Sequence, residues 1–257
     1  MRFQSATATL LSACLFACPS VQAGADGGDT ALRDSGDAAH LFGYRIHPGA
    51  QARFEDGYRR HLAWHRTHRD ALVWYGWIVA DGPRQGMFVD GTFGAPFAAF
   101  DRRVDLPGDG ADAASNVTPH AEPAWRASYR LRREFGNGQA LERWQPGASA
   151  RVVHYRLRAG TQPRFERALA AARERLRGRP GASSQAWYET VSGGDLPGFM
   201  RIEQQGGWTA HDAPPADPEA LLRDAPELGD LRASVESARA ETWTYRPDLS
   251  LIPGAAP

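Results

Sequence analysis

Apolar and polar residues alternate with a period of two in two short segments of the chain, 42–47 (FGYRIH) and 153–158 (VHYRLR). Such alternation places apolar side chains on one face of a β-strand and polar side chains on the other. Each segment is followed by a glycine, and after the glycine apolar residues recur at helical spacing, over 53–72 and 164–176. Each half of the chain is therefore predicted to begin with a strand and a helix.

The later elements also follow one order in both halves. Two apolar strands flank a glycine-containing turn, and a weaker helical stretch and a final strand come after them. The order βαββαβ, twice, predicts an α+β protein built from ferredoxin-like units. The ranges are 73–79, 86–92, 96–103 and 126–135 in the first half, and 186–192, 199–205, 218–225 (with 228–240 as a further helical stretch) and 241–245 in the second.

An internal repeat explains the shared order. Residues 44–55 read YRIHPGAQARFE and residues 155–166 read YRLRAGTQPRFE, so seven of twelve positions are identical at an offset of 111. A Trp-Tyr pair recurs later at an offset of 113, which predicts two tandem copies of one fold. The expected organisation is a signal peptide at 1–23, a flexible linker at 24–39, repeat 1 at 40–136, a linker at 137–150, repeat 2 at 151–250 and a tail at 251–257.

Residues 72–79 (LVWYGWIV) lack polar alternation, which is expected of a strand buried on both faces. The two sheets are therefore predicted to pack face to face as an α+β barrel within one chain, and the protein to be a monomer. This arrangement and the shared Y-R-x-x-x-G-x-x-x-x-F-E segment resemble the NIPSNAP-like branch of the dimeric α+β-barrel superfamily, over roughly residues 40–250. The superfamily includes cofactor-free quinone-forming monooxygenases, haem enzymes and members without assigned activity. The resemblance carries no catalytic residue, because the matching positions are structural.

The first 23 residues predict export. Arg2 is the only charge before a short uncharged stretch, and Val21-Gln22-Ala23 has small residues where signal peptidases cut, so cleavage is expected after Ala23. The alternative is a lipoprotein, because Leu11-Ser12-Ala13-Cys14 resembles a bacterial lipobox with a lipid anchor at Cys14. Both alternatives place the folded part in the periplasm or outside the cell. The apolar run is too short to span a bilayer, and no transmembrane segment is predicted.

Composition excludes several chemistries. All thirty basic residues are arginine, they balance thirty acidic residues, and the only cysteines are Cys14 and Cys18. A lysine Schiff base, a Walker-type lysine, a thiol nucleophile and a cysteine metal site are therefore ruled out in the folded part. Serine-hydrolase and dinucleotide motifs are missing, and so is the aromatic signature of RNA-binding ferredoxin-like domains. No nucleic-acid partner is expected.

His61, His65 and His68 form the most specific chemical pattern. At 100° per residue they lie on or beside the apolar stripe of the first predicted helix, with His65 at its centre. Imidazoles at i and i+4 can chelate a metal ion, and an inward histidine can be a haem ligand. No H-E-x-x-H or adjacent carboxylate set completes a zinc motif, and one straight helix cannot bring all three to one ion. Hydrogen-bonded histidines without a cofactor are the main expectation, and a divalent metal or haem is the alternative.

The polar faces of the two first strands form a second candidate, for ligand binding. They point away from the helices and therefore toward the space between the sheets. An arginine buried there needs an anionic partner, which is either a carboxylate such as Asp90 or Glu203 or a ligand anion. Aromatic residues of the hairpin strands would wall such a pocket, unless they are ordinary core. The candidates are Arg45, His47, His154, Arg156 and Arg158 on the first strands, and Tyr75, Trp77, Trp187 and Tyr188 on the hairpins.

These patterns define three functional hypotheses. The main one is an exported NIPSNAP-like protein of undefined activity that binds a small, partly apolar ligand between its sheets. The first alternative is a cofactor-free or haem-dependent monooxygenase-type enzyme with His65 and the strand aromatics at its centre, and the second is an envelope protein-interaction module. A binder predicts a pocket that no titratable group reaches, whereas an enzyme predicts a cavity reached by a histidine beside an aromatic wall.

Overall fold

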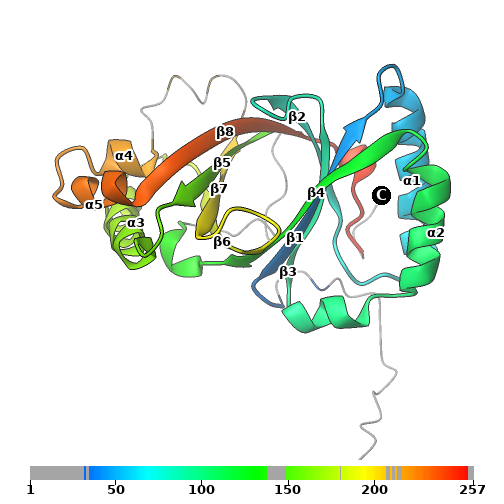
Figure 1. The fold of residues 1–257 in the computed structure, drawn as a ribbon, viewed down its shortest axis with the longest axis horizontal. Coiled ribbons are helices and arrows are strands. Elements are labelled where there is room, and N and C mark those ends of the chain that lie inside the picture. Colours follow the sequence, from blue (N-terminus) through cyan, green and yellow to red (C-terminus); the bar gives the residue numbers. More distant parts are fainter. Residues whose placement is uncertain are drawn as a thin grey trace, which may run out of the picture.

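In the computed structural model the eight strands close into one barrel (Figure 1). The structure describes residues 32, 35–137, 149–179, 181–206, 209, 212 and 216–253, so the predicted signal peptide, with Cys14 and Ala23, lies outside the described residues. The strands are β1 (Ala38–Ile46), β2 (Tyr75–Asp81), β3 (Phe88–Ala95), β4 (Ala121–Leu131), β5 (Ser149–Leu157), β6 (Gln185–Ser192), β7 (Gly198–Gln205) and β8 (Val235–Tyr245).

The order around the barrel is β1-β3-β2-β8-β5-β7-β6-β4, and every neighbouring pair is antiparallel. Two of these pairs join the halves of the chain. One seam pairs β2 with β8, where Trp77 lies opposite Tyr245, and the other pairs β4 with β6, where Leu131 lies opposite Tyr188. The predicted α+β fold, with its two sheets facing each other across an interior formed by one chain, is confirmed. In addition to facing each other, the two sheets are hydrogen-bonded to each other along their edges, at the β2–β8 and β4–β6 seams.

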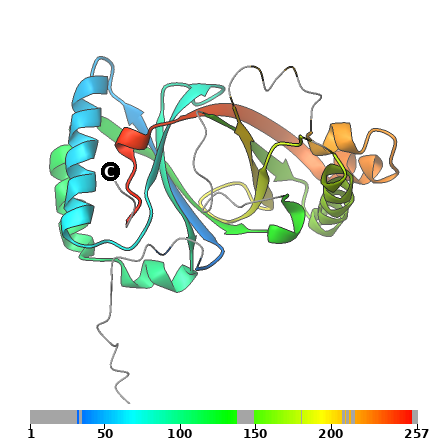
Figure 2. The ribbon, with the colours of Figure 1, turned by 180° about the vertical axis from the view of Figure 1, so that it is seen from behind.

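The helices cover two opposite outer sides of the barrel (Figures 1 and 2). Helices α1 (Gln51–Thr67) and α2 (Leu106–Asn116) lie on one side, and α3 (Gln162–Arg177), α4 (Pro218–Leu221) and α5 (Glu227–Ser234) on the other. Among the described residues, no helix has the length and apolar character needed to cross a bilayer. Short 3₁₀ helices are η1 (Phe97–Arg102), η2 (Arg133–Phe135) and η5 (Pro247–Leu249), and η5 with the C-terminal segment packs between α1 and the sheet.

The sequence prediction was wrong for the second helix of the first half. The stretch 96–103 is the 3₁₀ helix η1, and the α-helix lies further on, in α2. Residues 106–116 (LPGDGADAASN) contain a proline and two glycines, which are poor helix formers, so the sequence pattern predicted no helix there. The helix forms because Asp105 caps it by accepting a hydrogen bond from the Gly108 N–H, and because Pro107 stands in the first turn, where its missing N–H costs nothing. In the second half, 235–240 is part of strand β8 and not of a helix.

Side chains fill the barrel, and a second and third apolar cluster lie between the sheet and the helices on each side. The interior is rich in aromatic residues. The ring of Trp77 lies 5.6 Å from that of Trp243 and 5.8 Å from that of Phe93, and Tyr75 and Tyr188 pack beside them. Most of the barrel is thus solid core, which restricts ligand space to its end.

We expect Trp77→Ala to lower the free energy of unfolding by about 3–5 kcal/mol, because it opens a cavity where an indole is fully buried. The matched control is Phe97→Ala on η1, whose side chain is among the exposed large hydrophobic ones and whose loss should cost less than about 1 kcal/mol. Urea unfolding followed by circular dichroism measures both. Equal costs would contradict the placement of Trp77 inside a closed barrel.

Candidate functional site

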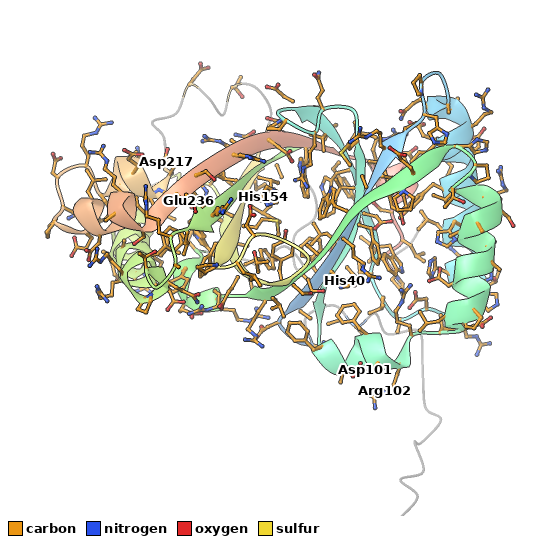
Figure 3. The ribbon with its side chains drawn as sticks, viewed as in Figure 1. His40, Asp101, Arg102, His154, Asp217 and Glu236 are labelled. Carbon is orange, nitrogen blue, oxygen red and sulfur yellow. The ribbon has the colours of Figure 1, made fainter. Side chains whose placement is uncertain are left out.

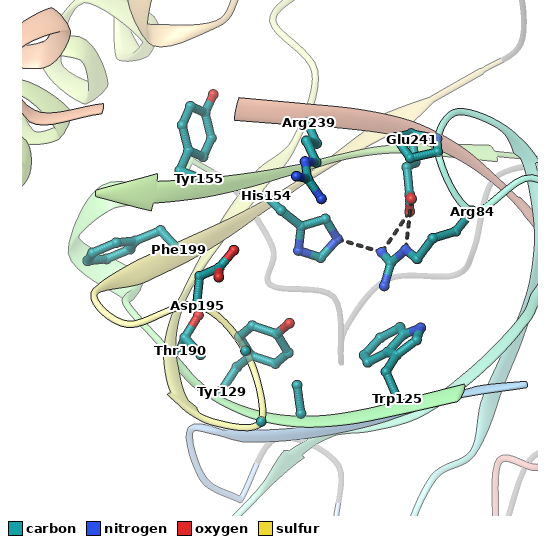
Figure 4. Close-up of a pocket in the computed structure, with 14 residues that line it drawn as sticks. Arg84, Trp125, Tyr129, His154, Tyr155, Thr190, Asp195, Phe199, Arg239 and Glu241 are labelled. Carbon is teal, nitrogen blue, oxygen red and sulfur yellow. Dashed lines mark hydrogen bonds and ion pairs between the residues drawn. The ribbon is translucent and has the colours of Figure 1, made fainter. Parts of the chain in front are cut away.

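A cavity of about 300 Å³ occupies one end of the barrel interior (Figure 4). Its volume is at the lower end of the range for small-molecule sites, roughly 300–1,000 Å³. Strands and turns from both halves of the chain form its wall. The lining residues are Pro83, Arg84, Trp125, Ala127, Tyr129, His154, Tyr155, Thr190, Gly193, Gly194, Asp195, Phe199, Arg239 and Glu241.

Arg84, Glu241 and His154 form a hydrogen-bonded chain across this cavity (Figure 4). The Arg84 guanidinium donates two hydrogen bonds to the Glu241 carboxylate, from Nε to Oε1 at 2.8 Å and from Nη2 to Oε2 at 2.7 Å. Nη2 also donates to Nε2 of His154 at 2.8 Å. Arg84 comes from the turn between β2 and β3, whereas His154 and Glu241 lie on β5 and β8. The chain of contacts therefore joins the two halves of the protein.

The contact with Arg84 determines the protonation of His154. Arginine has no acceptor, so Nε2 of His154 must accept and the ring proton must lie on Nδ1. Burial and then the positive charge of Arg84 lower the pKa of His154 to about 4. Burial alone would raise the pKa of Glu241, but hydrogen bonds and charge from Arg84 outweigh it and hold that pKa below its ordinary value. At neutral pH the cavity therefore contains a neutral imidazole beside an ionised pair.

Aromatic residues form the opposite wall. Trp125 on β4 lies under Arg84, whose guanidinium carbon is 4.4 Å from the ring centroid. The indole fits there because β1 has Gly43 opposite it, where a Cβ atom would lie only 2.0 Å from the indole nitrogen. Tyr129 lies four residues further along β4, on the same face of the strand. It is buried, and burial raises the pKa of its hydroxyl to about 12 and keeps it protonated. The cavity thus combines a flat apolar wall with neutral hydrogen-bond donors.

Of the predicted ligand residues on the first strands, only His154 lines the cavity. Figure 3 labels His154 beside β5. Arg45 is exposed and pairs with Glu122 at 3.6 Å, and Arg156 is exposed and pairs with Glu236 at 3.1 Å. These strands continue beyond the end of the barrel, so the side chains on the predicted face reach solvent instead of the interior. The remaining two, His47 and Arg158, are exposed as well.

The predicted aromatic wall divides between two environments. Tyr75, Trp77 and Tyr188 lie in the solid core of the barrel, and Trp187 faces helix α3 on the outer side of the sheet. The predicted carboxylate partners are elsewhere too. Asp90 faces α1 and accepts a hydrogen bond from Tyr58 at 2.7 Å, while Glu203 pairs with the buried Arg201 at 3.4 Å. Neither Asp90 nor Glu203 lines the cavity, where Glu241 supplies the carboxylate.

The three histidines of α1 separate into a buried pair and an exposed one. His61 and His65 are buried on the outer side of the sheet against α2, whereas His68 is exposed and stacks on Trp64 with ring centroids 4.0 Å apart. The three therefore do not share one site. None of them lines the barrel cavity.

His65 and His154, the two inward-facing histidines considered as haem ligands, do not fit that role. Nε2 of His65 lies 3.3 Å from Nε2 of His61 and 3.4 Å from a carboxylate oxygen of Asp109, which leaves no space for a macrocycle. In the cavity, Nε2 of His154 is taken by Arg84 at 2.8 Å. Neither the α1 histidine pair nor His154 therefore supports a haem at its place.

Among the cavity residues that sequence reasoning missed are the four on which the site most depends, Arg84, Trp125, Tyr129 and Glu241. Arg84 lies in a turn and the others are on the final strands, whose alternation was recognised only in part. The period-two pattern of 153–158 did find His154, because strand parity is a local property. Which residues of other strands meet it depends on the pairing of the two halves, and the sequence pattern does not contain that information.

Comparison with known proteins gives structural but not sequence matches. No family model and no curated protein matches the chain. A provisionally named monooxygenase of Lactobacillus acidophilus is similar in structure, with a TM-score of 0.55 and 12% identity over 86% of this chain and 98% of that one. The chain has the dimeric α+β-barrel fold. An anthrone oxidase-like protein (TM-score 0.54, 13% identity, 84% and 93% covered) and chlorite dismutase of Candidatus Nitrospira defluvii (0.53, 7%, 82% and 91%) share it.

His154 makes stability depend on pH. Its pKa is about 4 in the fold and ordinarily 6.5, so the unfolded chain binds more protons between these values. Its contribution is complete above pH 6.5 and is lost as the pH falls toward 4. We therefore expect the unfolding free energy of wild type, relative to that of His154→Gln, to fall by roughly 1–3 kcal/mol between pH 7 and 4. Urea unfolding at a series of pH values measures the difference, and a pH-independent difference would contradict a neutral buried His154.

Proposed function

We propose that the protein is an oxygen-using enzyme of the cofactor-free type, and that its substrate binds in the cavity at the end of the barrel. The observation that carries this proposal is the neutral imidazole of His154, held by Arg84 in a cavity walled by Trp125. A histidine beside an aromatic wall is what an enzyme predicts and a simple binder does not. The similar fold of a provisionally named monooxygenase and an anthrone oxidase-like protein supports the same class of reaction.

The cavity favours a small, electron-rich aromatic substrate with an oxygen atom. Its ring would lie beside Trp125 and Arg84, which covers the indole face, and the Nδ1–H of His154 would donate a hydrogen bond to the substrate oxygen. This donor stabilises the negative charge that develops on that oxygen when the substrate loses a carbon-bound proton. His154 itself is a poor base at neutral pH, because its pKa is about 4 and its Nε2 is occupied. The exposed carboxylate of Asp195, on the rim, is the group proposed to accept the proton.

The reaction needs no reductant besides the substrate. An activated CH₂ group beside an aromatic ring gives four electrons and becomes C=O, and O₂ takes these electrons to supply one oxygen to the carbonyl and one to water. The two hydrogens of the CH₂ group leave with the water, so atoms and electrons balance. The protein's part is to orient the substrate and to hold its anion.

Anthrone serves as a probe of this chemistry. We expect wild-type protein to consume one O₂ for each anthraquinone formed, and His154→Gln to lower kcat/KM by roughly 10²-fold, because removal of one donor to a developing oxyanion has an effect of that order. Oxygen uptake and quinone absorbance measure the reaction. The matched control is His47→Gln, a surface histidine just after β1 whose loss should leave kcat/KM unchanged.

A wild-type rate equal to the spontaneous rate would contradict the enzyme proposal. Tryptophan quenching by anthrone, measured in the same samples, then reports whether the cavity binds the compound without converting it. Quenching that disappears in Trp125→Phe would assign that binding to the cavity. The protein would then be better described as a ligand-binding protein, which is the main hypothesis from the sequence.

We further propose that the protein is exported by residues 1–23 and acts as a monomer, with a NIPSNAP-like origin for its two halves. The charge pattern before Ala23 supports export, with lipidation at Cys14 as the alternative. Closure of the barrel by one chain supports a monomer, because no second copy is needed to cover the open sheet face. The shared segment at 44–55 and 155–166 supports the duplication.

A further inference from the structure

Helix α2 is held against α1 without a hydrophobic face of its own. None of its residues is buried, yet the two helices cross closely at Gly57, where a Cβ atom would lie 1.8 Å from the carbonyl oxygen of Asn116. Polar side chains fill the contact. Packing of an amphipathic face usually positions a helix of this length, so a different interaction must position α2.

Three ligand atoms converge in this contact. Nε2 of His61 and Nε2 of His65 lie 3.3 Å apart, and each is 3.4 Å from Oδ1 of Asp109 on α2. The centre of a triangle with these edges is about 1.9 Å from each corner, close to the 2.0–2.1 Å of zinc–histidine bonds. In a tetrahedral site with bonds of this length, neighbouring ligand atoms are about 3.4 Å apart, and the three distances in this contact match that value. One face of a tetrahedral site is therefore present without any movement of the chain.

Hydrogen bonds fix the orientation of both imidazoles. Nδ1 of His61 lies 2.8 Å from the carboxylate of Asp112, and Nδ1 of His65 lies 2.8 Å from that of Asp70. A carboxylate accepts, so each Nδ1 carries the ring proton and each Nε2 turns its lone pair inward. Two lone pairs and a carboxylate oxygen then face one another in a buried space. A positive charge between them, either a metal ion or a proton shared by two of these atoms, relieves their mutual repulsion.

The groups around the ligands are fixed as well. Asp70 accepts hydrogen bonds from the Trp74 indole at 3.0 Å and from the Leu72 N–H at 3.0 Å. Arg103 donates to Oδ2 of Asp109 at 2.6 Å, which leaves Oδ1 for the histidines. Partners of this kind orient the ligands of metal sites and raise the basicity of the imidazoles.

We propose that His61, His65 and Asp109 bind one divalent transition-metal ion of the zinc class, which clamps α2 to α1. Two imidazole nitrogens and one carboxylate suit this class and leave one position for water. The ion lies on the outer side of the sheet, so the clamp is independent of the cavity and of the proposed function. Its role is structural, because it supplies the attachment that apolar packing does not.

Titration of tag-free protein with Co²⁺ tests the site, because tetrahedral Co²⁺ has strong visible absorption bands. After removal of metal with a chelator, we expect wild type to bind one Co²⁺ per chain with these bands, and Zn²⁺ to displace it. Asp109→Asn and His61→Gln should bind at least roughly 10²-fold more weakly. His68→Gln, at the end of the same helix, is the matched control, and it should bind as wild type does because His68 is exposed and is not one of the three converging ligands.

Thermal unfolding provides the second measurement. Zn²⁺ should raise the Tm of wild type and His68→Gln but not that of Asp109→Asn, since an ion that binds only the folded state stabilises it. The Asp109→Asn side chain has the same shape as the original, and circular dichroism shows whether this variant folds. If His61→Gln does not fold, Asp109→Asn alone tests the metal site. The proposal would be overturned if wild type bound Co²⁺ no more tightly than Asp109→Asn does. It would also be overturned if His68→Gln lost as much affinity for Co²⁺ as Asp109→Asn does.

Discussion

The pairing of β2 with β8 and of β4 with β6 is the constraint on which the rest of the structure depends. An antiparallel sheet with helices on one face leaves its other face to be covered. In this chain the two sheets cover each other, and the seams join their edges, so the barrel has no free edge strand in its ring. The aromatic interior around Trp77 and Trp243 is buried for this reason, and the space left at the end of the barrel becomes a cavity that opens to solvent at its rim.

The candidate site exists only because the halves are joined. Arg84 and Trp125 come from the first half, and His154 and Glu241 from the second. Glu241 offsets the charge of Arg84, and Arg84 then occupies the basic nitrogen of His154. A histidine in this position is a donor of fixed direction instead of a base, because protonation would place two cations in contact in a region of low dielectric constant. In the proposed reaction such a donor orients and stabilises an anionic intermediate, and the nearby carboxylate of Asp195 accepts the proton.

Local patterns in the sequence predicted more than long-range ones. Alternation found the strands and the parity of His154, and helical spacing placed His61 and His65 on the buried side of their helix. The sequence did not reveal that α2 exists, since its proline and glycines indicate a loop until the cap at Asp105 is known. Asp109 was therefore missing from the metal hypothesis. The partners of His154 were missed for a different reason, because strand pairing between distant segments decides which side chains meet inside the barrel.

The protonation of His154 is the most direct test of this account. Nitrogen-15 NMR of histidine-labelled protein at pH 5.5, with His154→Gln to assign the signals, reports the charge and tautomer of each imidazole. We expect His154 to be neutral, with its proton on Nδ1, at a pH where an ordinary histidine is mostly charged. A protonated imidazolium, or a neutral ring with its proton on Nε2, would contradict the contact with Arg84. It would also contradict the closure of the barrel by the two halves, which brings Arg84 and His154 together.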